Sequence, residues 1–155
     1  MRGGGLPPKT IALTFDDGPG ARTIELSHYL KEQGVRAGFF VMGKNVRARA
    51  DGEAILQALV DDGHVIGNHT WTHPDLTTLT PESVVSEITD TDALIARFLP
   101  DGRFMFRPPY GALHAPIFAA LEASPMSKYV GPIDWDMGAA WTATTAADWD
   151  CWSKT

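Results

Sequence analysis

The feature that most constrains this chain is the alternation of short apolar segments with longer amphipathic ones. Segments rich in β-branched and aromatic residues predict strands over 9–15, 36–43, 64–70, 103–106 and 127–135. Apolar residues at helical spacing predict helices over 22–33, 53–63, 81–98 and 114–123. Thr80 and Pro81 are typical of the N-cap and first position of the third helix. Because alternating strands and helices are typical of a parallel sheet, the sequence predicts one α/β domain.

Clusters of polar side chains follow at least four of the predicted strands. They lie in the segments TFDDGP (14–19), HTWTH (69–73), RPPYG (107–111) and DWDMGAAW (134–141). The loops that follow the strands of a β/α barrel converge on one face, where such side chains meet. We therefore expect a closed or partly closed β/α barrel rather than an open doubly wound sheet. The sequence has no Gly-rich phosphate loop that would support nucleotide binding.

Charge and composition exclude several classes of partner. The 155 residues carry a formal net charge of −6, which counts against nucleic acid as a ligand. The single cysteine, Cys151, excludes an intrachain disulfide framework. No apolar run reaches the length of a membrane span. Residues 1–8 lack the apolar core of a signal peptide, so we expect them to be a leader segment ahead of the domain.

The first two polar clusters together favour a metal site. His69 and His73 are four residues apart, so both imidazoles could point the same way from a helical turn and share one divalent ion. Two unrelated loop histidines are the alternative for this pair alone. Two histidines and one carboxylate of the Asp16–Asp17 pair would leave coordination positions open, as in catalytic zinc sites. Such an ion lowers the pKa of a bound water to about 7. The second aspartate could then take the proton of the water.

The other two clusters add a cation and aromatic rings. The prolines of RPPYG restrict the backbone, so Arg107 and Tyr110 are expected to be held in place. Arg107 could pair with a carboxylate and keep it ionised, although a surface turn with an incidental arginine would have the same sequence. The segment 134–141 combines aspartates with tryptophans, whose faces suit sugar rings. Plain core and capping roles would also explain these residues.

The motifs TFDDGP, GHVIGNHTWTH and FRPPYG, in this order, resemble those of the polysaccharide deacetylases of carbohydrate esterase family 4, the NodB-homology domain. The resemblance covers residues 9 to about 141. It implies a distorted β/α barrel that removes acetyl groups from a polysaccharide with the help of a metal ion. The catalytic domain would occupy residues 9–155, and its surroundings would be extracellular or the cell envelope. The expected partner is an acetylated polysaccharide or oligosaccharide.

The resemblance also implies a role for each motif residue. Asp17, His69 and His73 would hold one divalent ion, zinc in the first place and cobalt or nickel as alternatives. Asp16 would be the general base, and Arg107 would orient it. The backbone N–H of Tyr110 would join the metal in stabilising the oxyanion. Substrate-binding residues would come from the fourth motif: Trp135, Asp136 and Trp141.

Two departures from the family pattern bear on activity. If Trp135 opens the fourth motif, Ala140 stands where the family commonly has the aspartate that pairs with the arginine, and Asp134 or Asp136 could substitute. The family's Leu-x-His motif, which supplies a general-acid histidine, is absent before Thr155. His114 is expected at a helix start rather than in that role. We therefore expect a C-terminally incomplete barrel with an exposed strand edge and uncovered apolar surface.

These patterns favour a deacetylase of N-acetylglucosamine polymers such as chitin, chitooligosaccharides or peptidoglycan. An acetylxylan esterase with the same site is the nearest alternative. A carbohydrate-binding pseudoenzyme that lacks the general acid is a second alternative, and a structural metalloprotein a third. The 155-residue chain is expected to bind one divalent ion and to deacetylate slowly or not at all.

Overall fold

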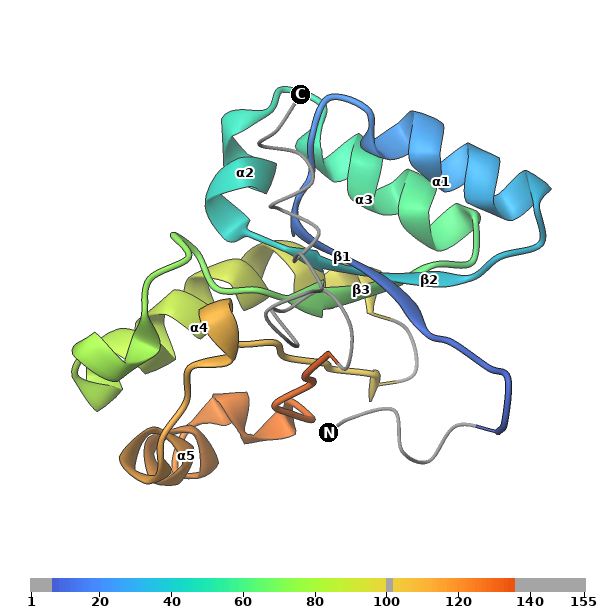
Figure 1. The fold of residues 1–155 in the computed structure, drawn as a ribbon. Coiled ribbons are helices and arrows are strands. Elements are labelled where there is room, and N and C mark those ends of the chain that lie inside the picture. Colours follow the sequence, from blue (N-terminus) through green and yellow to red (C-terminus); the bar gives the residue numbers. More distant parts are fainter. Residues whose placement is uncertain (1–6, 100–101, 136–155) are drawn as a thin grey trace, which may run out of the picture.

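A three-stranded parallel sheet forms the centre of the molecule (Figure 1). The computed structural model describes residues 7–99 and 102–135. The strands lie in the order β1 (Leu13–Gly18), β2 (Ala37–Val41) and β3 (Val65–Asn68). Two isolated parallel bridges, Asn68 to Phe106 and Met105 to Val130, continue the arrangement beyond β3. The parallel α/β architecture predicted from the sequence is therefore confirmed.

The helices are arranged around this sheet in two groups. Figure 1 shows α1 and α3 side by side above the strands, with α4 and α5 lower in the view. The helices are α1 (Thr23–Glu32), α2 (Gly43–Ala48), α3 (Gly52–Asp61), α4 (Pro81–Ile95) and α5 (Ala115–Glu122). Short 3₁₀ helices occupy Leu76–Thr78, Ala96–Phe98, Pro109–Gly111 and Pro125–Lys128. None of the helices within the described ranges is long and apolar enough to cross a membrane.

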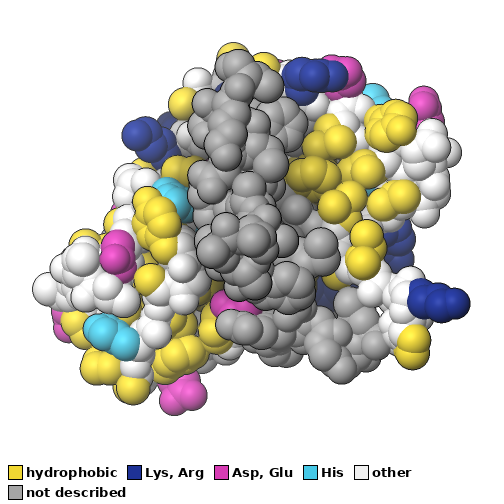
Figure 2. Space-filling view, in the orientation of Figure 1, with side chains coloured by type: hydrophobic (Ala, Val, Ile, Leu, Met, Phe, Trp, Pro, Cys, Tyr) yellow, Lys and Arg dark blue, Asp and Glu magenta, His cyan; other side chains and the backbone are white. Residues whose placement is uncertain are grey.

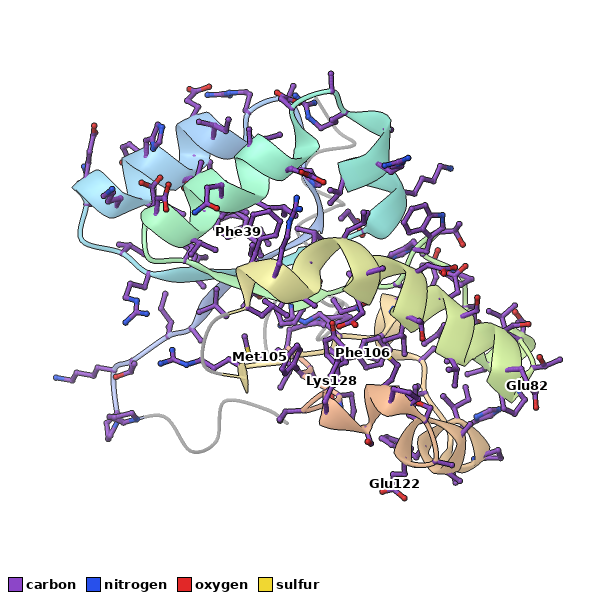
Figure 3. The ribbon with its side chains drawn as sticks, turned by 180° about the vertical axis from the view of Figure 1, so that it is seen from behind. Phe39, Glu82, Met105, Phe106, Glu122 and Lys128 are labelled. Carbon is purple, nitrogen blue, oxygen red and sulfur yellow. The ribbon has the colours of Figure 1, made fainter. Side chains whose placement is uncertain are left out.

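Two apolar clusters hold these elements together. One lies between the sheet and α1 and α3, and it includes Phe39, Leu56 and Ile66. The other lies between α4, α5 and the bridge segment at 105–106, and it includes Ile88 and Phe106. Figure 3 labels Phe39 and Phe106, one in each cluster. Full burial of such a side chain contributes about 1.5–3 kcal/mol, so both clusters stabilise the strand ends that carry the polar residues.

Most predicted elements are present, with shifted boundaries and one clear error. The side chain of Thr80 accepts a hydrogen bond from the Ser83 N–H at 3.3 Å, which confirms it as the N-cap of α4. The predicted strand over 127–135 is wrong, because a 3₁₀ helix covers Pro125–Lys128 and only Val130 makes a strand bridge. Pro132 lacks the N–H that a strand ladder needs there. Helix α2 was not predicted.

One edge of the sheet carries apolar surface. Within the described ranges β1 pairs only with β2. An open groove of about 1140 Å³ lies beside it, lined by Phe15, Leu26 and Tyr29 among others. Hydrophobic side chains also gather beside the grey residues at the right of the space-filling view (Figure 2). Among the described residues β1 is therefore an edge strand with an apolar groove beside it.

Candidate active site

The adjacent aspartates lie in a β-bulge rather than in a loop. Phe15 is paired with Phe39 and Gly18 with Val41, so β1 has one more residue than β2 across this interval. Asp17 takes up the extra length with a left-handed backbone, at φ 65°. A bulge of this kind redirects side chains. The predicted strand end at residue 15 is thus corrected, since the strand runs through the doublet to Gly18.

Asp17 points toward both predicted metal-binding histidines. Its Oδ1 lies 3.4 Å from Nε2 of His69 and 3.2 Å from Nε2 of His73. One potential ligand atom from each of these three residues lies within 4.8 Å of the other two. A carboxylate and two imidazoles are donors that Zn²⁺ prefers. The donor set therefore fits a divalent ion of the kind expected from the sequence.

A backbone carbonyl fixes the tautomer of His69. Nδ1 of this buried ring lies 2.7 Å from the carbonyl oxygen of Arg107. Because a carbonyl only accepts, Nδ1 carries the proton and donates it in this bond. The lone pair of Nε2 is then directed at Asp17, as a metal ligand requires.

The protonation states of the other two groups also suit metal binding. The proximity of His69 lowers the pKa of Asp17, and the nearby His73 adds to this effect against the opposing effect of burial. Burial lowers the pKa of His73, and this effect is larger than the opposing effect of the Asp17 charge. Neutral imidazole and ionised carboxylate are the forms that bind a metal ion.

Arg107 anchors the other aspartate of the doublet. Nη1 donates to Oδ1 of Asp16 at 2.7 Å and to the hydroxyl of Thr14 at 2.9 Å. Nε donates to the carbonyl of Ile133 at 2.9 Å. The guanidinium carbon lies 4.0 Å from the centre of the Phe40 ring, and the side chain is only 3% exposed. Such a well-held cation fixes the orientation of the adjacent carboxylate.

The RPPYG segment places Tyr110 beside His73, one of the candidate metal ligands. Its ring stands edge-on to that of His73, with 4.7 Å between the centroids, and it is 66% exposed. The backbone of Tyr110 is left-handed, at φ 58°. Pro108 and Pro109 immediately precede it and restrict the chain, in line with the sequence expectation.

Left-handed backbone is concentrated around this site. Apart from Lys9, the non-glycine residues with positive φ among those described are Asp17, Thr70, His73 and Tyr110. For a β-branched residue such as Thr70, at φ 68°, this conformation is strained. Strain of this kind persists only where surrounding contacts over-determine the backbone. The two histidines therefore converge through a loop with two left-handed residues, and not through the helical turn considered from their spacing.

Sequence reasoning missed the residues that hold these loops. Helix α2 begins where the N–H groups of Gly43 and Lys44 donate to the carbonyls of Thr70 and Trp71, at 3.0 and 3.1 Å. Asn45 donates from its side-chain amide to the carbonyl of Asp17 at 2.7 Å. Helix α2 thus connects the two segments that carry the candidate metal ligands.

A second set of supports comes from β3 and α4. The side chain of Asn68 accepts from Thr70 N–H and donates to the carbonyl of Ile88, both at 2.9 Å. Glu87 accepts hydrogen bonds from Trp71 and Thr72. Asn68 directly precedes the HxxxH pair, which is the one sequence signal that could have pointed to it.

The remaining predicted residues have mixed outcomes. Trp135 lies near the site, with the guanidinium carbon of Arg107 5.4 Å from its ring centre. Asp136 and Trp141, predicted with it as substrate-binding residues, lie outside the described residues, as do residues 1–6 of the predicted leader. His114 is exposed and precedes α5 at its N-cap position, in line with the expected helix start.

Comparison with known proteins decides the family. The family model described as polysaccharide deacetylase matches residues 3–128. The chain belongs to this family. The expectation drawn from the three sequence motifs is therefore confirmed.

Individual relatives in the polysaccharide deacetylase family are longer than this chain. A chitin deacetylase of Pestalotiopsis sp is 40% identical over 108 residues, which are 70% of this chain and 36% of the relative. A peptidoglycan-N-acetylmuramic acid deacetylase of Bacillus subtilis (strain 168) is 34% identical over 128 residues, 82% of this chain and 27% of the relative. The chain therefore spans about a third of the length of these curated relatives.

A solved structure supports the fold. The family 4 carbohydrate esterase from Streptomyces lividans, in complex with acetate, is similar with a TM-score of 0.62 and 36% identity. The alignment covers 71% of this chain and 56% of that one. The predicted fold class, the α/β architecture of the polysaccharide deacetylases, is therefore confirmed over this part of the domain.

Proposed function

We propose that this chain is a metal-dependent deacetylase that hydrolyses the N-acetyl groups of N-acetylglucosamine polymers, namely chitin, chitooligosaccharides or peptidoglycan. The observation that carries the proposal is the convergence of Asp17, His69 and His73 beside an aspartate that Arg107 holds. The names of the relatives, a chitin deacetylase and a peptidoglycan-N-acetylmuramic acid deacetylase, support an N-acetylated polysaccharide as the class of substrate. Because chitin and peptidoglycan lie outside the cell membrane, we also propose an extracellular or cell-envelope location.

The three converging side chains would hold the metal ion, zinc in the first place and cobalt or nickel as alternatives. A divalent ion in this position supplies Lewis acidity toward the acetyl carbonyl and makes water a stronger acid. The protein's part is to favour the neutral form of His73 and the ionised form of Asp17. The hydrogen bond of His69 to the Arg107 carbonyl also fixes the tautomer of that ring.

Asp16 is the proposed general base. Its carboxylate takes a proton from the attacking water, a function worth about 10²- to 10⁴-fold in rate when the base is well placed. Arg107 orients this carboxylate through a 2.7 Å ion pair. The two aspartates therefore divide the work, one as metal ligand and one as base.

We extend the proposal to the region where negative charge develops on the acetyl oxygen. The left-handed backbone of Tyr110 directs its N–H differently from that of an extended residue, and the ring stands against His73. An N–H held in this way beside the metal ligands would donate to the oxyanion. Trp135, near Arg107, would form one wall of the acetyl-binding pocket.

A second candidate function is a carbohydrate-binding pseudoenzyme, because no histidine in the described part of the chain is left to act as the general acid. The sequence has five histidines, all within the described ranges. Besides the two metal ligands, His28 is paired with Asp62, and buried His64 bonds to Ala37 N–H and the Ser27 carbonyl.

The fifth histidine, His114, is exposed at the start of α5. In the described structure none of His28, His64 and His114 is hydrogen-bonded to a residue of the candidate site. The 155-residue chain is therefore expected to release acetate slowly, unless another group donates the proton to the leaving amine.

Acetate release from a panel of substrates tests the proposal. The panel contains N-acetylated chitooligomers, peptidoglycan and acetylxylan, each incubated with the Zn²⁺-loaded chain and with the chain treated with EDTA. Slow release from an N-acetylated polymer, abolished by EDTA, is the expected result. Release from acetylxylan alone would favour the esterase alternative. Saturable binding of an oligomer without any release would favour the pseudoenzyme.

A further inference from the structure

A glutamate on α4 contacts the loop that joins the two metal-binding histidines. Oε2 of Glu87 accepts hydrogen bonds from the N–H groups of Trp71 and Thr72, at 2.9 and 2.8 Å. Oε1 accepts from the hydroxyl of Thr72 at 2.7 Å. Glu87 is partly buried at the middle of the helix. One carboxylate therefore binds both peptide N–H groups at the centre of the His69–His73 loop.

This loop needs external support because its backbone is strained. Thr70 and His73 both have left-handed backbones, at φ 68° and 65°. Each such residue costs on the order of 1–3 kcal/mol, and it remains in that conformation only when its surroundings demand it. Without support the loop would relax, and the two imidazoles would separate. The geometry shared with Asp17 would then be lost.

The support comes from two sides of the same peptide units. Helix α2 donates to the carbonyls of Thr70 and Trp71 from the N–H groups of Gly43 and Lys44. Glu87 accepts from the N–H groups of the same two units, which are those of Trp71 and Thr72. The side chain of Trp71 also packs closely on α2, since a Cβ at Gly43 would lie 2.2 Å from its ring. The N–H groups of Trp71 and Thr72 are thus bonded to Glu87, and the carbonyls of the same peptide units are bonded to α2.

We propose that Glu87 is a positioning residue for the metal site, which sets metal affinity by holding the His69–His73 loop in its ligating conformation. The inference rests on the proposed function, because it takes the two histidines as ligands. Glu87 itself lies outside the cluster of ligand atoms and acts through Trp71 and Thr72. Residues that orient ligands in this way typically change metal affinity by about 10- to 100-fold when removed.

The test compares three variants of the 155-residue chain by titration with Zn²⁺. Glu87→Ala removes all three hydrogen bonds and should weaken Zn²⁺ binding by about 10- to 100-fold. Glu87→Gln keeps an oxygen for the two N–H groups, and the Thr72 hydroxyl can donate or accept, so affinity should stay within a few-fold of wild type. Asp90→Ala, which removes an exposed carboxylate from the same helix, should bind as wild type does.

A spectroscopic readout separates positioning from general stability. The Co²⁺-loaded Glu87→Ala variant should show a changed visible absorption spectrum at a temperature where circular dichroism shows it folded. The Glu87→Gln variant should restore the wild-type spectrum. If Glu87→Ala does not fold, Thr72→Val removes only the hydroxyl bond to Oε1, and we expect about fivefold weaker binding.

Two results would overturn the inference. One is a folded Glu87→Ala variant with wild-type Zn²⁺ affinity and an unchanged Co²⁺ spectrum. The other, if that variant does not fold, is wild-type affinity in Thr72→Val. Zn²⁺ binding and acetate release by the wild-type chain report on the proposed function itself, so a failure there is distinguishable from a failure of the role of Glu87.

Discussion

The backbone carbonyl of Arg107 accepts a hydrogen bond from Nδ1 of His69 at 2.7 Å, while the guanidinium of the same residue holds Asp16 at 2.7 Å. One residue therefore orients a proposed metal ligand through its main chain and the proposed base through its side chain. Because the two contacts come from different parts of Arg107, a side-chain substitution should separate their effects.

Arg107→Lys should reduce turnover while leaving metal binding largely intact. The lysine keeps a positive charge but loses the forked contacts to Thr14, Asp16 and Ile133. Misplacement of the base by about 1 Å can cost roughly 10²-fold in rate, whereas the carbonyl bond to His69 stays. Acetate release and Zn²⁺ titration measure the two effects. Exposed Arg103→Lys is the control. Equal losses of Zn²⁺ affinity and of acetate release in Arg107→Lys would contradict separate roles for the side chain and the main chain of Arg107.

Asp62 should make folding stability dependent on acid pH. Burial alone would raise its pKa, but hydrogen bonds from Lys31, Ser27 and His28 outweigh burial, so the pKa is lowered from 3.8. In the unfolded chain the Asp62 carboxyl has its ordinary pKa and binds a proton more readily than in the folded protein. The contribution of Asp62 to the free energy of unfolding is therefore complete above about pH 5, and it declines as the pH falls below the pKa of the unfolded chain.

Comparison of wild type with Asp62→Asn measures this contribution. The variant should lose about 1–3 kcal/mol of unfolding free energy at pH 7, because a buried charged acceptor is replaced. The difference between the two proteins should shrink as the pH falls toward 3 in urea titrations. Asp61→Asn, at the exposed neighbouring position, is the matched control. A difference independent of pH would show that the charge of Asp62 is not what stabilises the α1–α3 contact.

The candidate ligand cluster could be predicted from the sequence because its residues lie in short motifs at strand ends. The HxxxH spacing and the aspartate doublet named all three members of the cluster that the structure brings together. Their local conformation could not be predicted. The bulge at Asp16–Asp17 depends on the pairing of β1 with β2, and the left-handed Thr70 depends on contacts from other elements.

The supporting residues could not be predicted for the same physical reason. Helix α2 has only six residues, and its first N–H groups bond to carbonyls of a distant loop, so its start has no local sequence signal. Glu87 has the sequence context of an ordinary residue on an amphipathic helix. The segment over 127–135 has the composition of a strand, but Pro125 and Pro132 restrict its backbone and its hydrogen bonding. In each case tertiary contacts override local preference.

Gly67→Ala should destabilise the sheet beneath the site. A Cβ at Gly67 would lie 2.4 Å from Cδ1 of Phe40, whose ring supports the Arg107 guanidinium. Overpacking in a buried strand costs about 1–3 kcal/mol. Chemical denaturation measures the loss, and Gly20→Ala, where a Cβ would meet only ordinary contact, is the control. Unchanged stability of Gly67→Ala would mean that the Phe40 ring moves aside freely.

The division of labour between the two adjacent aspartates is the central claim, and Zn²⁺ titration of two variants tests it most directly. Asp17 lies within the ligand cluster and Asp16 is paired with Arg107 instead. Asp16→Asn should therefore bind one Zn²⁺ with an affinity close to that of wild type, and it should release no acetate. Asp17→Ala should lose specific Zn²⁺ binding. Equal Zn²⁺ affinity in the two variants would contradict the account.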